Sequence, residues 1–217
     1  MKRYLKLAAA AMVTAAMAGC GGSGGSVSSP MNGPGQAPVP AGPYRLEMPK
    51  EVLKGTYKES DHSAPDQNIP VMLSGQIEHG VSAFAAYQPT GSTSDTGPVL
   101  AVTGVYGTVL NPVTARDEFL KILDRRTSVP DRRSTVITGP RAIIPQGSSE
   151  PVSCRVVRRA DQFGTVWEPD CAWADGSAVV HVSHTVYFEK PSADFDLEAL
   201  AAKTAIIRNE VRVAVAP

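Results

Sequence analysis

Cysteines and histidines are the side chains with which this chain of 217 residues could do chemistry, and both types are few. They are Cys20, Cys154 and Cys171, and His62, His79, His181 and His184. A thiol nucleophile needs a base beside it, and a metal ion needs several ligands on one side of the fold. The sequence has no Gly-x-Ser-x-Gly elbow between a strand and a helix, no His-Glu-x-x-His helix and no phosphate-binding glycine loop. The motifs indicate no catalytic residue, metal or cofactor. Whether the protein is an enzyme stays open, with a non-enzyme favoured.

Residues 1–19 have the composition of an export signal. Three positive charges within residues 1–6 precede the apolar residues 7–18, a run too short to span a bilayer as a helix, which takes ~20 residues. The string Met17-Ala18-Gly19-Cys20 resembles the bacterial lipobox, whose cysteine is lipid-modified and becomes the first residue of the mature protein. We therefore expect Cys20 to carry a lipid that holds the protein on the extracytoplasmic face of the cell membrane. The alternative is an ordinary secreted protein in which Cys20 has no role.

The segment that follows the cysteine has the composition of a flexible tether. Glycine, serine and proline dominate residues 21–43, and such a segment cannot bury enough apolar surface to offset its ordering entropy. We expect residues 20–43 to be a lipidated cysteine with a disordered tether of ~25–30 Å, followed by a single domain at 44–217. Without the three basic residues of the signal, 18 basic residues remain against 21 acidic ones. This balance gives no reason to expect a nucleic-acid partner.

The remaining two cysteines are expected to form a disulfide. An exported domain lies in an oxidising compartment, where a pair of cysteines is normally bridged. Residues 151–160 and 164–173 both look like strands, and the residues between them look like a turn that ends in glycine. An antiparallel hairpin with this turn places Cys154 directly opposite Cys171. The alternative is two free buried cysteines.

The same hairpin predicts a row of polar side chains on its other face. Its register places Arg155 opposite Asp170. A second tight turn at Asp175-Gly176 adds residues 177–188 as a third strand, and we expect His181 of this strand beside Asp170. The row of Arg155, Asp170 and His181 is the one candidate polar site of the sequence. The alternative, which we favour, is a row of surface ion pairs, because such pairs are common and stabilise little.

His181 and His184 do not indicate a metal site by themselves. They are three residues apart in an expected strand, and positions three apart on a strand face opposite sides of the sheet. The two imidazoles therefore cannot bind one ion together.

Eight arginines fall close together in the sequence, in a stretch with few acids. They are Arg125, Arg126, Arg132, Arg133, Arg141, Arg155, Arg158 and Arg159. On one surface they would form a basic patch for anionic headgroups or wall polymers. The alternative, which we favour, is a solvated face whose arginines pair with acids close in the sequence.

Alternating and apolar stretches indicate four further strands and two helices. The strands are 44–49, 81–87, 99–109 and 134–144, and the helices run over 111–126 and 194–212. Asn111 and Pro112 suit the cap and the first position of a helix, and Gly104 indicates a close approach of the backbone. Residues 60–75 carry little pattern and are expected to form a long loop. Strands joined by tight turns pair antiparallel, so we predict an α+β domain: an antiparallel sheet packed by two main helices, one after Asn111 and one at the C-terminus.

The string CAWADG at Cys171–Gly176, with the hairpin from Cys154, resembles a group of uncharacterised actinomycete lipoproteins and membrane-anchored proteins. Residues 44–49, the strand end that runs into Asn111-Pro112 and the final helix are similar too. The resemblance covers most of the domain but implies no activity and no site residue. The order of elements is similar to that of the PsbP/Mog1-type α/β/α sandwich, and a shared topology implies no function.

These observations favour a non-catalytic binding or accessory domain in the cell envelope, anchored to the membrane by lipid, with an envelope protein or an anionic polymer as its partner. An envelope enzyme is the first alternative, with a site built from loops such as residues 60–75 and from His62 or His79. A small-ligand carrier is the second, and it would need a large apolar cavity between sheet and helix.

Overall fold

The computed structural model describes residues 44–61, 63–92, 98–127, 133–161, 164–185 and 195–215. The export signal, the tether, Cys20 and His62 lie outside the described residues, so what the sequence indicates for them stays a prediction. The described residues belong to one unit of the chain. No helix within the described ranges is long and apolar enough to cross a bilayer.

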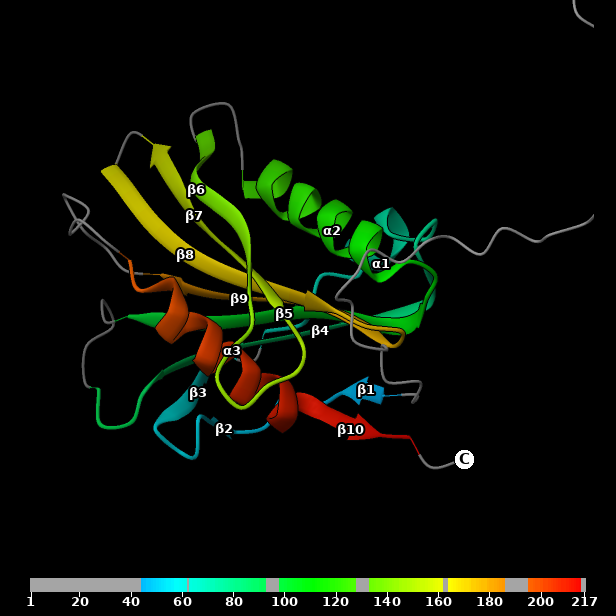
Figure 1. The fold of residues 1–217 in the computed structure, drawn as a ribbon, viewed down its shortest axis with the longest axis horizontal. Coiled ribbons are helices and arrows are strands. Elements are labelled where there is room, and N and C mark those ends of the chain that lie inside the picture. Colours follow the sequence, from blue (N-terminus) through cyan, green and yellow to red (C-terminus); the bar gives the residue numbers. More distant parts are fainter. Residues whose placement is uncertain are drawn as a thin grey trace, which may run out of the picture. The chain divides into compact units, whose positions relative to one another are not determined.

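An antiparallel sheet of eight strands runs through the described part of the domain (Figure 1). In spatial order the strands are β2 (Glu51–Val52), β3 (Tyr57–Asp61), β4 (Ile77–Pro89), β5 (Val99–Val109), β9 (Ala178–Thr185), β8 (Gly164–Ala174), β7 (Val152–Asp161) and β6 (Arg133–Ile143). A separate two-stranded ribbon pairs β1 (Tyr44–Leu46) with β10 (Arg212–Ala214). The predicted α+β class with an antiparallel sheet is confirmed.

Helices cover both faces of the sheet (Figure 1). One face carries α2 (Pro112–Thr127) with the short α1 (Asn68–Met72), and the other carries α3 (Leu197–Val211). The sequence placed both long helices correctly. The Asn111 side chain caps α2 by accepting from the Thr114 N–H at 3.1 Å, and the Asp196 carboxylate caps α3 by accepting from the Ala199 N–H at 2.9 Å.

Apolar side chains on the two faces of the central strands pack into two separate cores. The larger core lies between the sheet and α3 and contains the fully buried Trp173 and Tyr87. The smaller core lies under α2 and contains Phe119 and Val179. Successive residues of one strand serve opposite cores because side chains alternate across a sheet.

Gly104 explains how β1 crosses the sheet on the α3 face. A Cβ atom at this position would lie 2.7 Å from Cδ1 of Leu46, closer than side chains approach one another. The close approach that the sequence indicated at Gly104 is therefore a contact with the first strand.

Residues 60–75 are not the long loop that we expected. They contain the end of β3 and the whole of α1. Within this segment Ile69 and Leu73 are buried in the α2 core. A helix of five residues is too short to show helical periodicity, and its burial against α2 is a tertiary effect that the local sequence does not show.

The turn after β8 is longer than expected, and this shifts the neighbouring strand by two residues. His181 pairs with Ala172, and Ser183 takes the place opposite Asp170. The cause is the Asp175 carboxylate, which accepts from the N–H groups of Ser177 at 2.6 Å and Ala178 at 3.0 Å and so holds a wider turn. A shift by two residues keeps every side chain on its face, so His181 stays on the face of Asp170 but diagonal to it.

Candidate functional site

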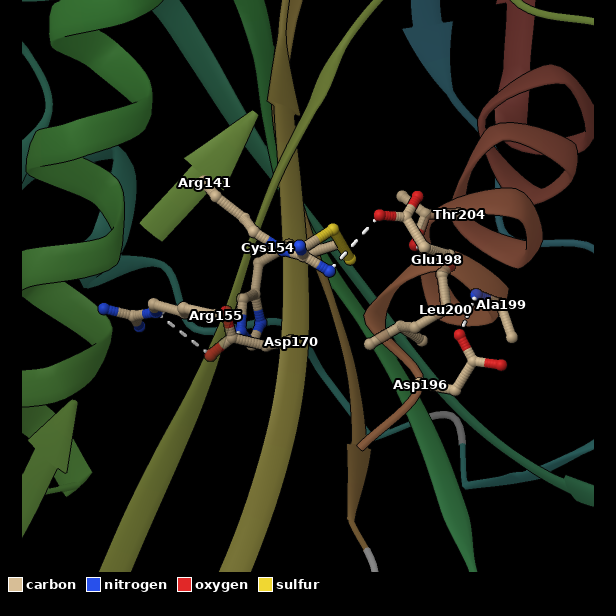
Figure 2. Close-up of a disulfide and its surroundings, with 11 residues drawn as sticks. Arg141, Cys154, Arg155, Asp170, Asp196, Glu198, Ala199, Leu200 and Thr204 are labelled. Carbon is tan, nitrogen blue, oxygen red and sulfur yellow. Dashed lines mark hydrogen bonds and ion pairs between the residues drawn. A yellow bond between two sulfur atoms is a disulfide. The ribbon is translucent and has the colours of Figure 1, made fainter. Parts of the chain in front are cut away.

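The β7–β8 hairpin has the predicted register. Cys154 lies opposite Cys171 and Arg155 opposite Asp170, and the two cysteines form a disulfide with both residues fully buried. Figure 2 shows the disulfide on the side of α3 and the Arg155–Asp170 pair on the side of α2. The hairpin therefore contributes a covalent link to one core and charged side chains to the opposite face.

Arg155 joins the sheet to α2 through two carboxylates. Its Nε donates to both carboxylate oxygens of Asp170, at 3.0 and 3.2 Å. Its Nη1 and Nη2 each donate to one oxygen of Asp124 on α2, both at 2.8 Å. The Arg155 side chain is only 6% exposed and that of Asp170 is 0% exposed. Our expectation of a surface row is wrong, because α2 covers this face and brings in Asp124.

The surroundings of Asp170 keep it charged in spite of its burial. Burial alone would raise its pKa, but His181 and Arg155 hold the pKa of this carboxyl below its ordinary value. Burial likewise favours the neutral form of Arg155, and Asp124 and Asp170 outweigh it and raise the pKa of the guanidinium. The pair is therefore a buried ion pair in which each ion depends on the other.

Three further side chains extend this cluster along the sheet. Glu168 is buried two residues before Asp170 on β8, and it forms an ion pair with Arg159 of β7. His181 on β9 is also buried, with Nε2 3.3 Å from Oδ2 of Asp170. We call the six side chains the charge network: Asp124, Arg155, Arg159, Glu168, Asp170 and His181.

The charge network contains a set of groups that could hold a metal ion. One ligand atom each from Glu168, Asp170 and His181 lie within 4.8 Å of one another. The row predicted from the sequence contains Asp170 and His181 but not Glu168, which lies two residues before Asp170 on the same face of the strand. It also lacks Asp124, which belongs to a helix distant in the sequence.

The other histidines do not join the charge network. His184 lies on the α3 face, opposite to His181, as the spacing on the strand predicts. His79 is exposed on β4, and His62 lies outside the described residues. The structure therefore brings neither His184 nor His79 to the candidate site.

Four of the eight arginines in the arginine-rich stretch form ion pairs. Arg126 pairs with Asp66, and Arg141 with Glu198 at 3.2 Å. Arg155 and Arg159 belong to the charge network, while the side chains of residues 132 and 133 lie outside the described part of the structure. The partners of these four arginines come from other elements as well as from nearby sequence, whereas Arg125 and Arg158 are exposed.

His184 gives the domain a pH dependence on the acid side of neutrality. Burial lowers its pKa from 6.5, and Lys203 of α3 lowers it further. The unfolded chain takes up this proton near pH 6.5 and the folded protein only at lower pH, so the free energy of unfolding falls as pH drops below that value. We expect His184→Gln to flatten this slope between about pH 5 and 7 in urea denaturation. His79→Gln, at an exposed position, should keep the slope, and equal slopes in His184→Gln and the unchanged protein would contradict the assignment.

No protein-family model matches the chain, and no curated protein matches it. What the domain does must therefore be inferred from its own residues. The features that bear on function are the buried disulfide, the charge network and the side chains that the surface exposes.

Proposed function

We propose that the chain is a lipid-anchored protein of the cell envelope, and that its domain is a non-catalytic binding or accessory module on the extracytoplasmic face of the membrane. The oxidised, fully buried pair of Cys154 and Cys171 is the observation that carries this proposal, because disulfides persist in oxidising compartments. The string Met17–Cys20 and the basic, apolar segment before it support export and anchoring. The resemblance to actinomycete lipoproteins points the same way.

A non-catalytic role is supported by the burial of the charge network. Asp170 is inaccessible to solvent, and the carboxylates of Asp170 and Glu168 are each bound by a guanidinium. Carboxylates held in this way are not free to touch a substrate. A carrier function has less support, because large side chains such as Trp173 and Tyr87 pack between the sheet and α3.

A protein partner has more support than an anionic polymer. Four of the eight arginines that could attract a polyanion have carboxylate partners of their own. The surface also exposes large apolar side chains, with Val71 on α1 70% exposed and Ile144 after β6 66% exposed. Exposed apolar groups of this size are typical anchors of protein interfaces.

A single experiment tests anchoring and binding together. A photo-crosslinking residue is placed at Ile144 in the intact chain, and in the same chain with Cys20→Ala. We expect the first protein to stay in the membrane fraction and to form one discrete adduct with an envelope protein in living cells. The Cys20→Ala chain should leave the membrane fraction, because its acyl chains are lost.

A crosslinking residue at the exposed Lys121 of α2 is the matched control, and no adduct is expected from it. Membrane retention of the Cys20→Ala protein would overturn the anchor. A second anchored protein carries the crosslinking residue at Val71. If neither the Ile144 protein nor the Val71 protein forms an adduct, the binding role is overturned.

A further inference from the structure

Several connecting segments meet at one end of the sheet, which we call the α1 end. β4, β7 and β9 begin there, while β5, β6 and β8 end there. The segments just outside these strands are residues 68–76, 110–113, 144–151 and 175–177. The Leu110 N–H donates to the Gln76 carbonyl at 2.9 Å, and the Val109 N–H donates to the Gly176 carbonyl at 3.1 Å. The end of α1, the start of α2 and the β8–β9 turn therefore lie side by side (Figure 1).

The α1 end exposes large apolar side chains. Half of those that the described residues expose lie in its few segments, and each is between 41 and 70% exposed: Val71, Met72, Leu110, Val113 and Ile144. Exposed apolar groups that gather in this way are typical of an interaction surface.

The tether joins the domain at the same end. Tyr44 directly follows the tether, and the centre of its ring lies 5.5 Å from Cζ of Arg212. Arg212 in turn forms an ion pair with Asp175 in the β8–β9 turn. These contacts place the first residue of the domain at the α1 end.

The reach of the tether decides which surfaces lie close to the membrane. A domain of this size is about 40 Å across, whereas the tether spans ~25–30 Å on average. With Cys20 anchored, the α1 end stays near the bilayer, and the opposite end of the sheet lies roughly a domain's width farther away.

We propose that the α1 end binds the extracytoplasmic part of an integral membrane protein. This inference rests on the proposed function and names the surface and the kind of partner for it. A partner embedded in the same membrane presents its own surface at the height of the α1 end, and the shared bilayer raises its local concentration. Val71, Leu110 and Ile144 supply apolar anchors of the kind that protein interfaces bury.

The composition of the α1 end disfavours the bilayer itself as the occupant. Protein surfaces that lie in the headgroup region combine apolar and aromatic side chains with many lysines or arginines. The four segments of the α1 end contain no lysine, arginine, tryptophan or phenylalanine, and their only charged residues are the acids Glu150 and Asp175. A protein surface is therefore the better match.

The test places a photo-crosslinking residue at Leu110 or Val113 of the anchored, full chain in living cells. Val136 is the matched control, because it is also 41% exposed but lies well inside β6, roughly 20 Å from the α1 end. We expect Leu110 and Val113 to form the same adduct as Ile144, and Val136 to form none. Mass spectrometry should assign the crosslinked peptide to the extracytoplasmic part of a protein with membrane-spanning helices.

Two substitutions in the protein that carries the crosslinking residue at Ile144 measure the surface and the shared membrane. Leu110→Ser should lower the adduct yield about fivefold or more, as loss of an apolar anchor does, whereas Val136→Ser should leave it unchanged. Cys20→Ala should lower the yield at least about tenfold, because the released domain loses its high local concentration.

An adduct with a soluble envelope protein, with a second copy of the chain or with lipid alone would overturn the inference. Equal yields from Val113 and Val136, or an unchanged yield in Cys20→Ala, would do the same. An adduct from Ile144 with none from Leu110 and Val113 would overturn the α1 end as the binding surface while the proposed binding role stands. Absence of adducts from both Ile144 and Val71 would overturn both.

Discussion

Replacing Asp170 by asparagine is expected to lower the free energy of unfolding by about 3–5 kcal/mol, because it leaves Arg155 charged and buried without its main partner in the sheet. The Arg155 side chain is almost completely buried and binds Asp170 through Nε. It keeps Asp124, which is partly exposed on α2, so we expect the lower end of the range. Urea denaturation followed by tryptophan fluorescence measures the loss.

The matched control for Asp170→Asn is Glu118→Gln on α2. Glu118 pairs with Lys121 at 3.0 Å, but their side chains are 38% and 62% exposed. Exposed pairs stabilise little, so this change should cost less than about 0.5 kcal/mol. Equal losses in the two variants would show that the buried pair of Arg155 and Asp170 stabilises the domain no more than an exposed pair does.

The features that the sequence predicted well are those that depend on neighbouring residues. Asp161 pairs with Gly164 at the end of the β7–β8 hairpin, and the register that follows from this pairing places Cys154 opposite Cys171. The cap at Asn111 sets the start of α2, and the run of residues in β5 has the bounds that its apolar pattern indicates. Local rules suffice in these places because the partners are close in the sequence.

The features that the sequence analysis missed are fixed by contacts between distant segments. β10 exists because it pairs with β1, at the other end of the described chain, and the three residues of β10 have no strand pattern of their own. The β2–β3 turn is held by Glu210 of α3, whose carboxylate accepts from the N–H groups of Leu53 and Lys54. No local pattern indicates such partners.

The candidate site shows the same division. Alternation along the strands correctly put Arg155, Asp170 and His181 on one face, even though the register of β9 was two residues off. Burial of that face depends on where α2 lies, and this is a tertiary property. The polar character of the face therefore looked like a solvated surface in the sequence, and Asp124 could not be assigned to it.

Replacing Cys154 and Cys171 together by alanine is expected to lower the free energy of unfolding by ~3 kcal/mol. The two residues are 17 apart in the sequence, and a cross-link that closes a loop of this size removes about that much free energy of loop closure from the unfolded chain. The lost sulfur atoms add a packing term, because both residues are fully buried in the α3 core. Urea denaturation under oxidising conditions measures the sum.

Reduction of the unchanged protein separates the two contributions. The reduced protein keeps both sulfur atoms, so its loss of stability against the oxidised form measures the cross-link, and the further loss in the double alanine variant measures packing. Trp173, which shares the strand face of Cys171 and is buried in the same core, reports unfolding in all three proteins. Equal stability of the oxidised and reduced proteins would contradict the expected stabilisation by the disulfide. It would also remove the main support for an oxidising compartment, because the domain would then be as stable with free thiols as with the cross-link.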